Sequence, residues 1–284
     1  MSEIDFNLSR PSYEDLNIDS DVSGYDTIEL KYDGIWGQFY AEEGRFSIWS
    51  RNGKKKKEGI LKTKVDHPLL LHGEFMFGSN WSQETGLSGK FFVFDAIKAG
   101  GKNWSSQPLS VRRKIAMNAV DLIGQPLTLV KSYPITDLKC IWHKHVALEG
   151  WEGVILKHTT QPFGKGWARI KAQFDVDYVC VGFNHSDAEK YKGKMVRSIK
   201  AGVYVDGELK HVCNVSGMNE GERRKMYDSP ELFLGKVFTA QGKRVHFNGS
   251  LRHPNFFRWH LDKKDTDCTL DSVLRVRGRT KLNE

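Results

Sequence analysis

Apolar and polar residues alternate in three short segments early in the chain, at residues 27–31, 37–40 and 45–50. This two-residue period is typical of strands that bury one face. Glu42-Glu43-Gly44 supplies turn residues between the second and third segments. We therefore expect an antiparallel meander here.

A helical period follows at residues 110–124. Apolar residues recur at helical spacing between Ser110, which can cap a helix, and Gly124, which can end one: Val111, Ile115, Ala119 and Leu122. A second helix is expected over residues 136–150, and a strand over residues 153–157.

The pattern changes after about residue 175 to short strands separated by turns. Strands are expected at residues 178–183, 195–205, 210–215, 236–240 and 245–248, with an Asp206-Gly207 hairpin turn and a short helix at 220–227. Several short strands around one helix are typical of a small barrel of the OB type. The fold class is therefore expected to be α+β: antiparallel sheets with flanking helices at residues 1–174, then an OB-type β-barrel domain at residues 175–284.

The composition fits a globular protein, with 39% hydrophobic and 27% charged residues and no long apolar run. A membrane-spanning helix is therefore not expected. Residues 1–5 lack the basic and apolar features of a secretory signal, so we expect a cytoplasmic protein. The four cysteines lie far apart without a CxxC pair, which favours reduced thiols over zinc ligands or disulfides.

The positive charge is unevenly distributed along the chain. The formal net charge is +8, yet residues 1–29 contain eight acidic residues and one basic residue. The other residues therefore carry a larger basic excess than the total indicates. A globular protein with such an excess is expected to bind polyanions, and nucleic acid in particular. The acidic opening is expected to be a surface lead-in.

Lys31 is the first candidate for covalent chemistry, because it precedes a glycine at the end of a predicted strand. A lysine acts as a nucleophile only after it loses its proton, which neighbouring cations or burial can favour. Taken alone, the four residues Lys31-Tyr32-Asp33-Gly34 are more typical of a surface lysine beside a turn.

Other segments with chemistry-bearing residues follow in a fixed order. They are KYDG (31–34), SRNG (50–53), HGEF (72–75), FFVFD (91–95), EGVILK (152–157), WARIK (167–171) and SLRHPNFFRWHLDK (250–263). In this order the segments resemble the motifs of the ATP-dependent DNA ligases, within the lysine nucleotidyl transferases that also include RNA ligases and capping enzymes. The last segment is the most specific, because it is similar to the signature that DNA ligases carry in their barrel. The resemblance implies that the first domain is an adenylation (nucleotidyltransferase) domain.

The resemblance implies that Lys31 takes AMP from ATP in a phosphoramidate linkage. Further nucleotide contacts are implied for Asp33, Arg51, Glu74, Phe94, Lys157, Arg169, Lys171 and Arg258. Within this set Phe94 would stack on adenine. Arg169 and Lys171 alternate along a strand, so both would point to one face and grip the α-phosphate. Glu29 lies two residues before Lys31 on the same strand face, where it would accept a hydrogen bond from the adenine amino group and favour ATP over GTP.

The resemblance also implies metal and DNA contacts. Glu74 and Glu152 would hold Mg²⁺ or Mn²⁺, since such cations prefer carboxylate oxygens. Asp262 and Lys263 would act with Arg258 on the departing pyrophosphate. The DNA contacts would come from basic residues in both domains: Arg51, Lys54, Lys55, Lys56 and Arg252.

The function that the resemblance implies is the sealing of 5′-phosphate/3′-hydroxyl nicks in duplex DNA, through Lys31-AMP and then an adenylated DNA end. We expect a compact, monomeric ligase of viral, phage or small bacterial type. Two residues depart from the family pattern, because Trp36 and His260 each stand where the family commonly has arginine.

Three alternatives stay open at this point. An RNA ligase or a capping enzyme would share Lys31 and Glu152 but not the barrel signature. A non-catalytic OB-type nucleic-acid-binding protein would not need Lys31, Glu74 or Glu152. A basic structural protein would leave the ordered motifs to coincidence.

Overall fold

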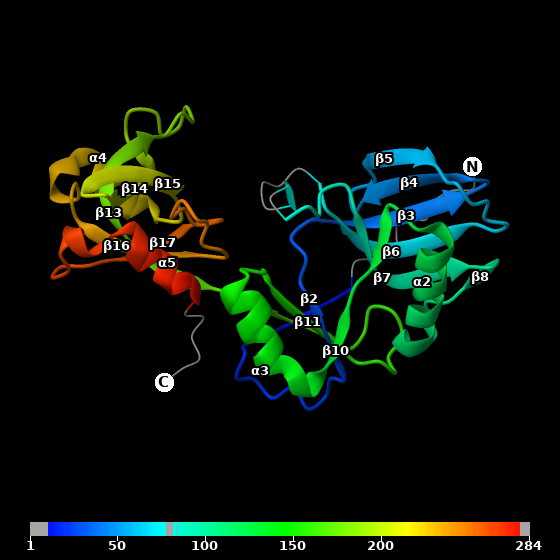
Figure 1. The fold of residues 1–284 in the computed structure, drawn as a ribbon. Helices are drawn as coiled ribbons and strands as arrows, with labels where there is room; N and C mark the ends of the chain where they lie inside the picture. Colours follow the sequence, from blue (N-terminus) through cyan, green and yellow to red (C-terminus); the bar gives the residue numbers. More distant parts are fainter. Residues whose placement is uncertain (1–10, 78–81, 84, 279–284) are drawn as a thin grey trace. The chain divides into compact units, whose positions relative to one another are not determined.

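The computed structural model describes residues 11–77, 82, 83 and 85–278, which form two compact units. Unit 1 contains the chain up to Trp142 together with Glu152–Ile170, and unit 2 contains His143–Trp151 and the chain from Lys171 onward. Both units combine antiparallel sheets with a few helices (Figure 1), so the α+β prediction is confirmed. The domain boundary at residues 174/175 stays a prediction.

The first sheet of unit 1 has five strands in the order β1-β12-β11-β2-β10. Their bounds are Glu14–Leu16, Trp167–Lys171, Gly153–Lys157, Thr27–Leu30 and Ser132–Pro134. β2 pairs antiparallel with β10 and β11. The predicted meander is therefore wrong at its first strand, because the hydrogen bonds of β2 go to strands far along the chain.

The second sheet of unit 1 has the order β5-β4-β3-β6-β7-β8, and β9 pairs with β7. The bounds in chain order from β3 to β9 are Ile35–Glu42, Arg45–Ser50, Lys55–Ile60, Leu69–Phe75, Phe91–Ala99, Lys102–Asn103 and Leu127–Leu129. The predicted turn between β3 and β4 is confirmed. Glu43 and Gly44 have φ values of 51° and 77°, as a tight hairpin turn requires.

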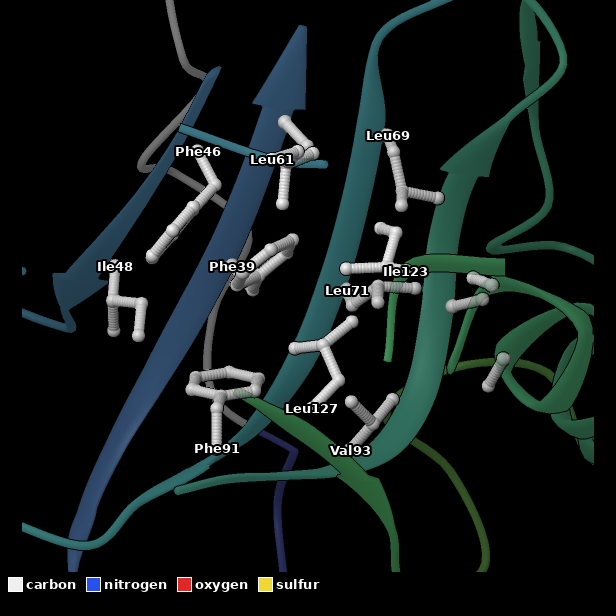
Figure 2. Close-up of a cluster of buried hydrophobic side chains, with 14 of the residues drawn as sticks. Phe39, Phe46, Ile48, Leu61, Leu69, Leu71, Phe91, Val93, Ile123 and Leu127 are labelled. Atoms are coloured by element: carbon white, nitrogen blue, oxygen red, sulfur yellow. The ribbon is translucent and has the colours of Figure 1, made fainter. Parts of the chain in front are cut away.

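The second sheet buries one face against helix α2, Leu109–Ile123 (Figure 2). Phe39, Leu71 and Phe91 come from neighbouring strands and are fully buried. Burying each such side chain contributes roughly 1.5–3 kcal/mol. The helix ends at Gly124 as expected, with φ 65°, but it begins after Pro108 and has no side-chain cap, so the predicted capping role of Ser110 is wrong.

The second predicted helix is present with mixed geometry. A 3₁₀ turn at Ile135–Asp137 leads into α3, Leu138–Ile141, and the chain continues as a π-helical segment, Trp142–Leu148. The strand that follows is β11, as predicted.

Unit 2 is an antiparallel sheet of five strands in the order β15-β14-β13-β16-β17, of the predicted OB type. The bounds from β13 to β17 are Phe174–His185, Val196–Val205, Glu208–Val215, Val237–Gly242 and Asn255–Trp259, and short 3₁₀ helices lie at Pro230–Leu232 and Asp265–Asp267. Helix α4, Glu220–Asp228, begins at a capping box, and α5, Leu270–Gly278, packs against β13 and β14.

Two local predictions in unit 2 have different outcomes. Asp206 and Gly207 form the expected turn, with φ values of 52° and 82°. The strand predicted at residues 245–248 is wrong, because there is only an isolated bridge between Val245 and Leu251. Within the described parts of both units, no helix is long and apolar enough to cross a membrane.

Candidate nucleotide site

Lys31 follows the last residue of β2 and lies beside Glu152, which precedes the neighbouring strand β11. Its backbone N–H donates to the carbonyl of Gly153 at 2.9 Å. Its Nζ lies 2.6 Å from Oε2 of Glu152, and 15% and 10% of the two side chains are exposed. The sheet therefore brings the predicted nucleophile and one predicted metal ligand into direct contact.

The glycine of the KYDG segment is needed for packing. A Cβ atom on Gly34 would lie 2.6 Å from the carbonyl oxygen of Phe75 and 2.9 Å from the Sδ atom of Met76. The backbone N–H of Gly34 donates to Oε1 of Glu74 at 3.2 Å. Close contact with β6 thus requires glycine at this position, and it fixes Glu74 next to the segment that carries Lys31.

A cavity in unit 1 collects many of the predicted nucleotide residues on its wall. It has about 450 Å³ of empty space, including a part open to solvent. Six of the predicted residues do not all contribute equally, but five of them line it: Lys31, Glu74, Phe94, Lys157 and Arg169. Glu29 lines it as well, together with Tyr13 and Trp167. Residues from β2, β6, β7, β11 and β12 therefore meet at one concave site.

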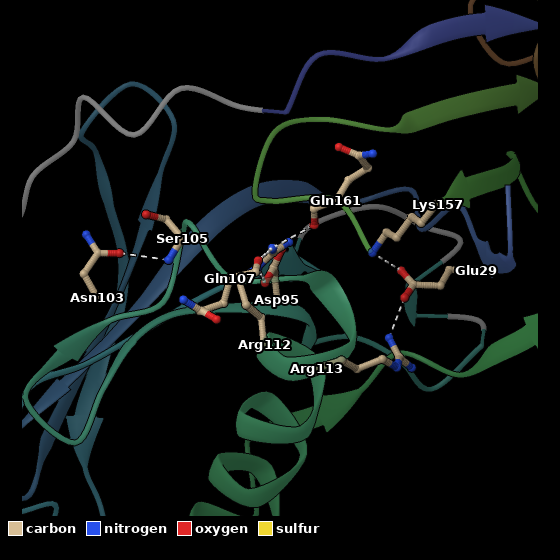
Figure 3. A network of polar contacts seen from close by, with 9 residues as sticks. All are labelled: Glu29, Asp95, Asn103, Ser105, Gln107, Arg112, Arg113, Lys157 and Gln161. Carbon is tan, nitrogen blue, oxygen red and sulfur yellow. Dashed lines mark hydrogen bonds and ion pairs between the residues drawn. The ribbon is translucent and has the colours of Figure 1, made fainter. Parts of the chain in front are cut away.

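Glu29 is almost fully buried at 3% exposure and is held by two cations (Figure 3). Its Oε1 lies 2.5 Å from Nη1 of Arg113, and its Oε2 lies 2.5 Å from Nζ of Lys157. The ammonium of Lys157 also lies over the ring of Trp167, 4.0 Å from its centroid. Burial lowers the pKa of Lys157, and the charge of Glu29 opposes that shift. Glu29 therefore takes part in a buried ion-pair network at the wall of the cavity.

Helix α2 supplies two consecutive arginines to two different carboxylates. Arg113 reaches Glu29, whereas Arg112 donates to both carboxylate oxygens of Asp95 on β7, at 2.7 and 2.8 Å (Figure 3). Arg112 and Asp95 are fully buried. The adjacent pairs fix α2 against both sheets of unit 1, since Glu29 lies on β2.

Arg169 is the third basic residue on the cavity wall, and it pairs with Asp15 on β1. Its Nε and Nη2 donate to the two carboxylate oxygens at 2.5 and 2.7 Å. The pairing raises the pKa of Arg169 further above its usual value. The guanidinium carbon also lies 5.4 Å from the ring centroid of Tyr13. The segment expected to be a surface lead-in therefore contributes two residues to the site.

Phe94 and Trp36 occupy the apolar surroundings of the site. Phe94 is 8% exposed and meets the ring of Trp167 edge to face, with centroids 5.6 Å apart. Trp36 is buried on β3, and its ring meets His72 at 5.0 Å. The side chain that replaces the family's arginine is thus part of the core. The stacking of adenine on Phe94 stays a prediction.

The remaining predicted residues of unit 1 are not on the described cavity wall. Asp33 is buried just after Lys31, and Arg51 is exposed in the turn between β4 and β5. Lys54 lies in the same turn, and Lys55 and Lys56 begin β5, an edge strand. Their predicted DNA contacts are untested.

Unit 2 carries the predicted barrel residues. Lys263 donates to Oδ2 of Asp177 at 2.6 Å, and His260 lies 3.4 Å from Oδ1 of the same carboxylate. His260 Nε2 is also 2.8 Å from the hydroxyl of Thr239. The histidine that replaces the family's second arginine therefore belongs to a polar cluster around Asp177.

The other predicted residues of unit 2 differ in exposure. Arg258 on β17 and Asp262 are exposed, whereas Arg252 is partly buried and burial lowers its pKa. Lys171 is the last residue of β12 and is partly buried. Their predicted roles remain predictions.

Sequence reasoning missed four residues at the cavity: Tyr13, Asp15, Arg113 and Trp167. Trp167 opened a matched motif but was given no role. Arg113 and Asp15 reach their partners across 84 and 154 positions of sequence. A local pattern contains no signal for such long-range pairs.

Comparisons with known proteins give related sequences and related folds. No protein-family model matches the chain. A curated DNA ligase of Acidianus ambivalens is 23% identical over 93% of this chain, and one of Saccharolobus islandicus is 22% identical over 91%. The alignments cover 57% and 56% of those proteins, so the chain spans a little over half their length.

Two solved structures have a similar fold. A structure named "Pmar-Lig_Pre." superimposes with a TM-score of 0.60 at 17% identity, covering 88% of this chain and 67% of that chain. A chain from a structure–function analysis of Lig E DNA ligases gives a TM-score of 0.59 at 18% identity, covering 89% of this chain and 100% of that chain. The predicted resemblance to the DNA ligases is thereby confirmed, in sequence and in fold.

Proposed function

We propose that the chain is an ATP-dependent DNA ligase that seals nicks through a Lys31-AMP intermediate. The observation that carries the proposal is the cavity of unit 1, where Lys31 meets a basic, an acidic and an aromatic side chain from separate strands. The curated relatives named DNA ligase support the same activity.

The first step would be adenylation of Lys31. Its Nζ would attack the α-phosphorus of ATP, forming the N–P bond while the P–O bond to the β-phosphate breaks and pyrophosphate leaves. Before the attack the ammonium of Lys31 must lose a proton, and the carboxylate of Glu152, 2.6 Å away, is suited to accept it. Arg169, on the same cavity wall, would stabilise the charge on the α-phosphate.

The carboxylates of the site suit a magnesium ion. No group of three or more His, Cys, Asp or Glu side chains is arranged for a metal in the described parts of the chain. Magnesium is commonly held by one or two carboxylates, with water and substrate phosphates completing its shell. Glu152 and Glu74 would therefore hold the ion, which when bound would neutralise charge on the phosphates. Mn²⁺ would suit the same ligands.

Glu29 would select the base of the nucleotide. A carboxylate held by two cations accepts hydrogen bonds and donates none. Adenine presents an amino donor at the position where guanine presents an acceptor. A base that reaches Glu29 through this edge is therefore favoured when it is adenine.

The later steps would transfer AMP to the 5′-phosphate of a nick and then join the 3′-hydroxyl with release of AMP. The exposed basic residues of unit 1, Arg51 and Lys54–Lys56, and Arg252 of unit 2 would contact DNA phosphates. Arg258, Asp262 and Lys263 would act on pyrophosphate in the first step. We expect the active protein to be a monomer.

The experiment that tests this function is sealing of a singly nicked, 5′-phosphorylated DNA duplex with ATP and magnesium. Wild type is compared with Lys31→Ala and with Lys62→Ala, which removes an exposed lysine of the same unit. We expect sealing and a covalent AMP adduct for wild type and Lys62→Ala, and neither for Lys31→Ala.

Two results would contradict the proposal. A folded wild-type protein that forms no AMP adduct would refute the nucleotidyl-transfer chemistry and favour a binding role. A protein that forms the adduct but seals only nicked RNA would be an RNA ligase.

A further inference from the structure

The short strand β1 is built into the nucleotide site. It pairs in parallel with β12, and the register sets Asp15 beside Arg169 and Leu16 beside Ile170. Neighbouring residues in this register project their side chains on the same face of the sheet. The sheet hydrogen bonds that hold β1 therefore also hold the Asp15 carboxylate next to the arginine.

Two side chains of this segment contact the Arg169 guanidinium from different directions. Asp15 accepts from Nε and Nη2 in a bidentate pair, and the Tyr13 ring lies against the guanidinium. Tyr13 also lines the cavity together with Arg169. Asp15 itself is 62% exposed, whereas Arg169 is only 23% exposed. The carboxylate thus reaches an arginine that is mostly enclosed by the wall of the site.

Arginine can serve two anions at once. A guanidinium has five N–H bonds in a planar fork, and the pair with Asp15 uses one on Nε and one on Nη2. Three N–H bonds are not used by Asp15 and remain for a phosphate. An ammonium has no second planar edge, so a lysine at this position would be drawn toward the carboxylate as a point charge.

We propose that Asp15 is a positioning residue, which holds the guanidinium of Arg169 so that its other edge serves the nucleotide phosphate. The inference rests on the proposed function and extends it to a residue outside the matched motifs. Tyr13 completes the arrangement by closing the cavity wall beneath the guanidinium.

The test measures formation of the Lys31-AMP adduct as a function of ATP concentration, in the full chain. Asp15→Asn removes the charge, and Glu14→Gln removes the same charge from the adjacent residue of β1, whose carboxylate accepts from Tyr25. We expect the KM for ATP to rise about three- to fivefold in Asp15→Asn with little change in kcat, as for the loss of a half-exposed ion pair. Asp15→Glu should restore most of the affinity, and Glu14→Gln should match wild type.

A second pair of variants separates positioning from simple charge balance. We expect Arg169→Lys to raise the KM, and Asp15→Asn in that background to lower it again, because the ammonium is then released from the carboxylate. A lower KM for Asp15→Asn in the wild-type background would make Asp15 a competitor of the phosphate and overturn the inference. Equal behaviour of Asp15→Asn and Glu14→Gln would also overturn it. Adduct formation by wild type shows separately that the proposed function holds.

Discussion

Replacement of His72 is expected to remove a specific sensitivity to acid. His72 lies on β6 and is fully buried, with the rings of Trp36 and Phe163 each 5.0 Å from its own. Its Nε2 lies 3.3 Å from Nε2 of Gln38, and its Nδ1 has no hydrogen-bond partner among the described residues. Such surroundings favour the neutral imidazole, because a charged ring would need a second acceptor.

The magnitude follows from the pKa. Burial, aided by the charge of Arg112, lowers the pKa of His72 to about 3, from 6.5 in an unfolded chain. Below pH 6.5 the unfolded state therefore takes up a proton that the folded state excludes. The stabilisation is fully present above pH 6.5 and is lost as the pH falls toward 3, at about 1.4 kcal/mol per pH unit. Between neutral pH and about pH 5 the loss is roughly 2 kcal/mol.

The assay is urea unfolding, followed by tryptophan fluorescence near pH 7 and pH 5. His72→Leu should be about 2 kcal/mol less sensitive to this change of pH than wild type, whatever its stability at neutral pH. His67→Gln serves as the control, since His67 is exposed on the same unit. An equal pH dependence for wild type and His72→Leu would refute the assignment of His72 as a buried neutral histidine.

Three further predictions concern other parts of the molecule. Arg112→Ala should lower the free energy of unfolding by about 3–5 kcal/mol, because it leaves a buried carboxylate unpaired, and Lys114→Ala on the exposed face of α2 should change it by less than about 0.5 kcal/mol; thermal and urea unfolding measure both. Replacement of the three lysines at residues 54–56 by glutamine should reduce the slope of log K against log salt for duplex DNA by up to about 0.9 per contact, as measured by fluorescence anisotropy, and an unchanged slope would exclude these lysines from the DNA interface. Asp177→Asn should destabilise unit 2 by about 1–3 kcal/mol through loss of the Lys263 pair, and calorimetry showing no change would mean that the pair is without net effect.

The sequence predicted elements well where the information was local. Gly124 ends α2, and the Asp206-Gly207 turn joins β14 to β15, because each depends on the backbone freedom of residues in that turn. The strand β2 was also found, but its partners were not. Pairing depends on which distant segments supply complementary edges, and alternation within one strand does not encode that choice.

The candidate site was predictable to a similar extent. The ordered motifs identified Lys31, Glu74 and Arg169, and the structure brings these three to one cavity. The carboxylate that holds Arg169 and the arginine that holds Glu29 lie outside the motifs. They could not be predicted from spacing, because the fold alone makes these segments neighbours.

The charges of the cavity explain why a basic chain need not have a bare positive site. Each basic side chain on the described wall has a carboxylate within 2.6 Å: Lys31 with Glu152, Lys157 with Glu29, and Arg169 with Asp15. A nucleotide would therefore not find free cations and would have to share or replace their partners. The three pairs differ in how they permit this. Lys157 and Glu29 are buried and would stay together, whereas arginine can add a phosphate while it keeps its partner.

Only the pair of Lys31 and Glu152 must separate for the proposed reaction, because a lysine held as an ammonium has no lone pair for the α-phosphorus. Loss of the carboxylate and loss of the amine should therefore have different consequences. Glu152→Gln keeps the nucleophile and removes the proton acceptor, so we expect slow but measurable adduct formation that rises with pH. Lys31→Ala should form no adduct at any pH. Equal loss of the adduct in both variants across the pH range would show that Glu152 does more than hold and accept this proton.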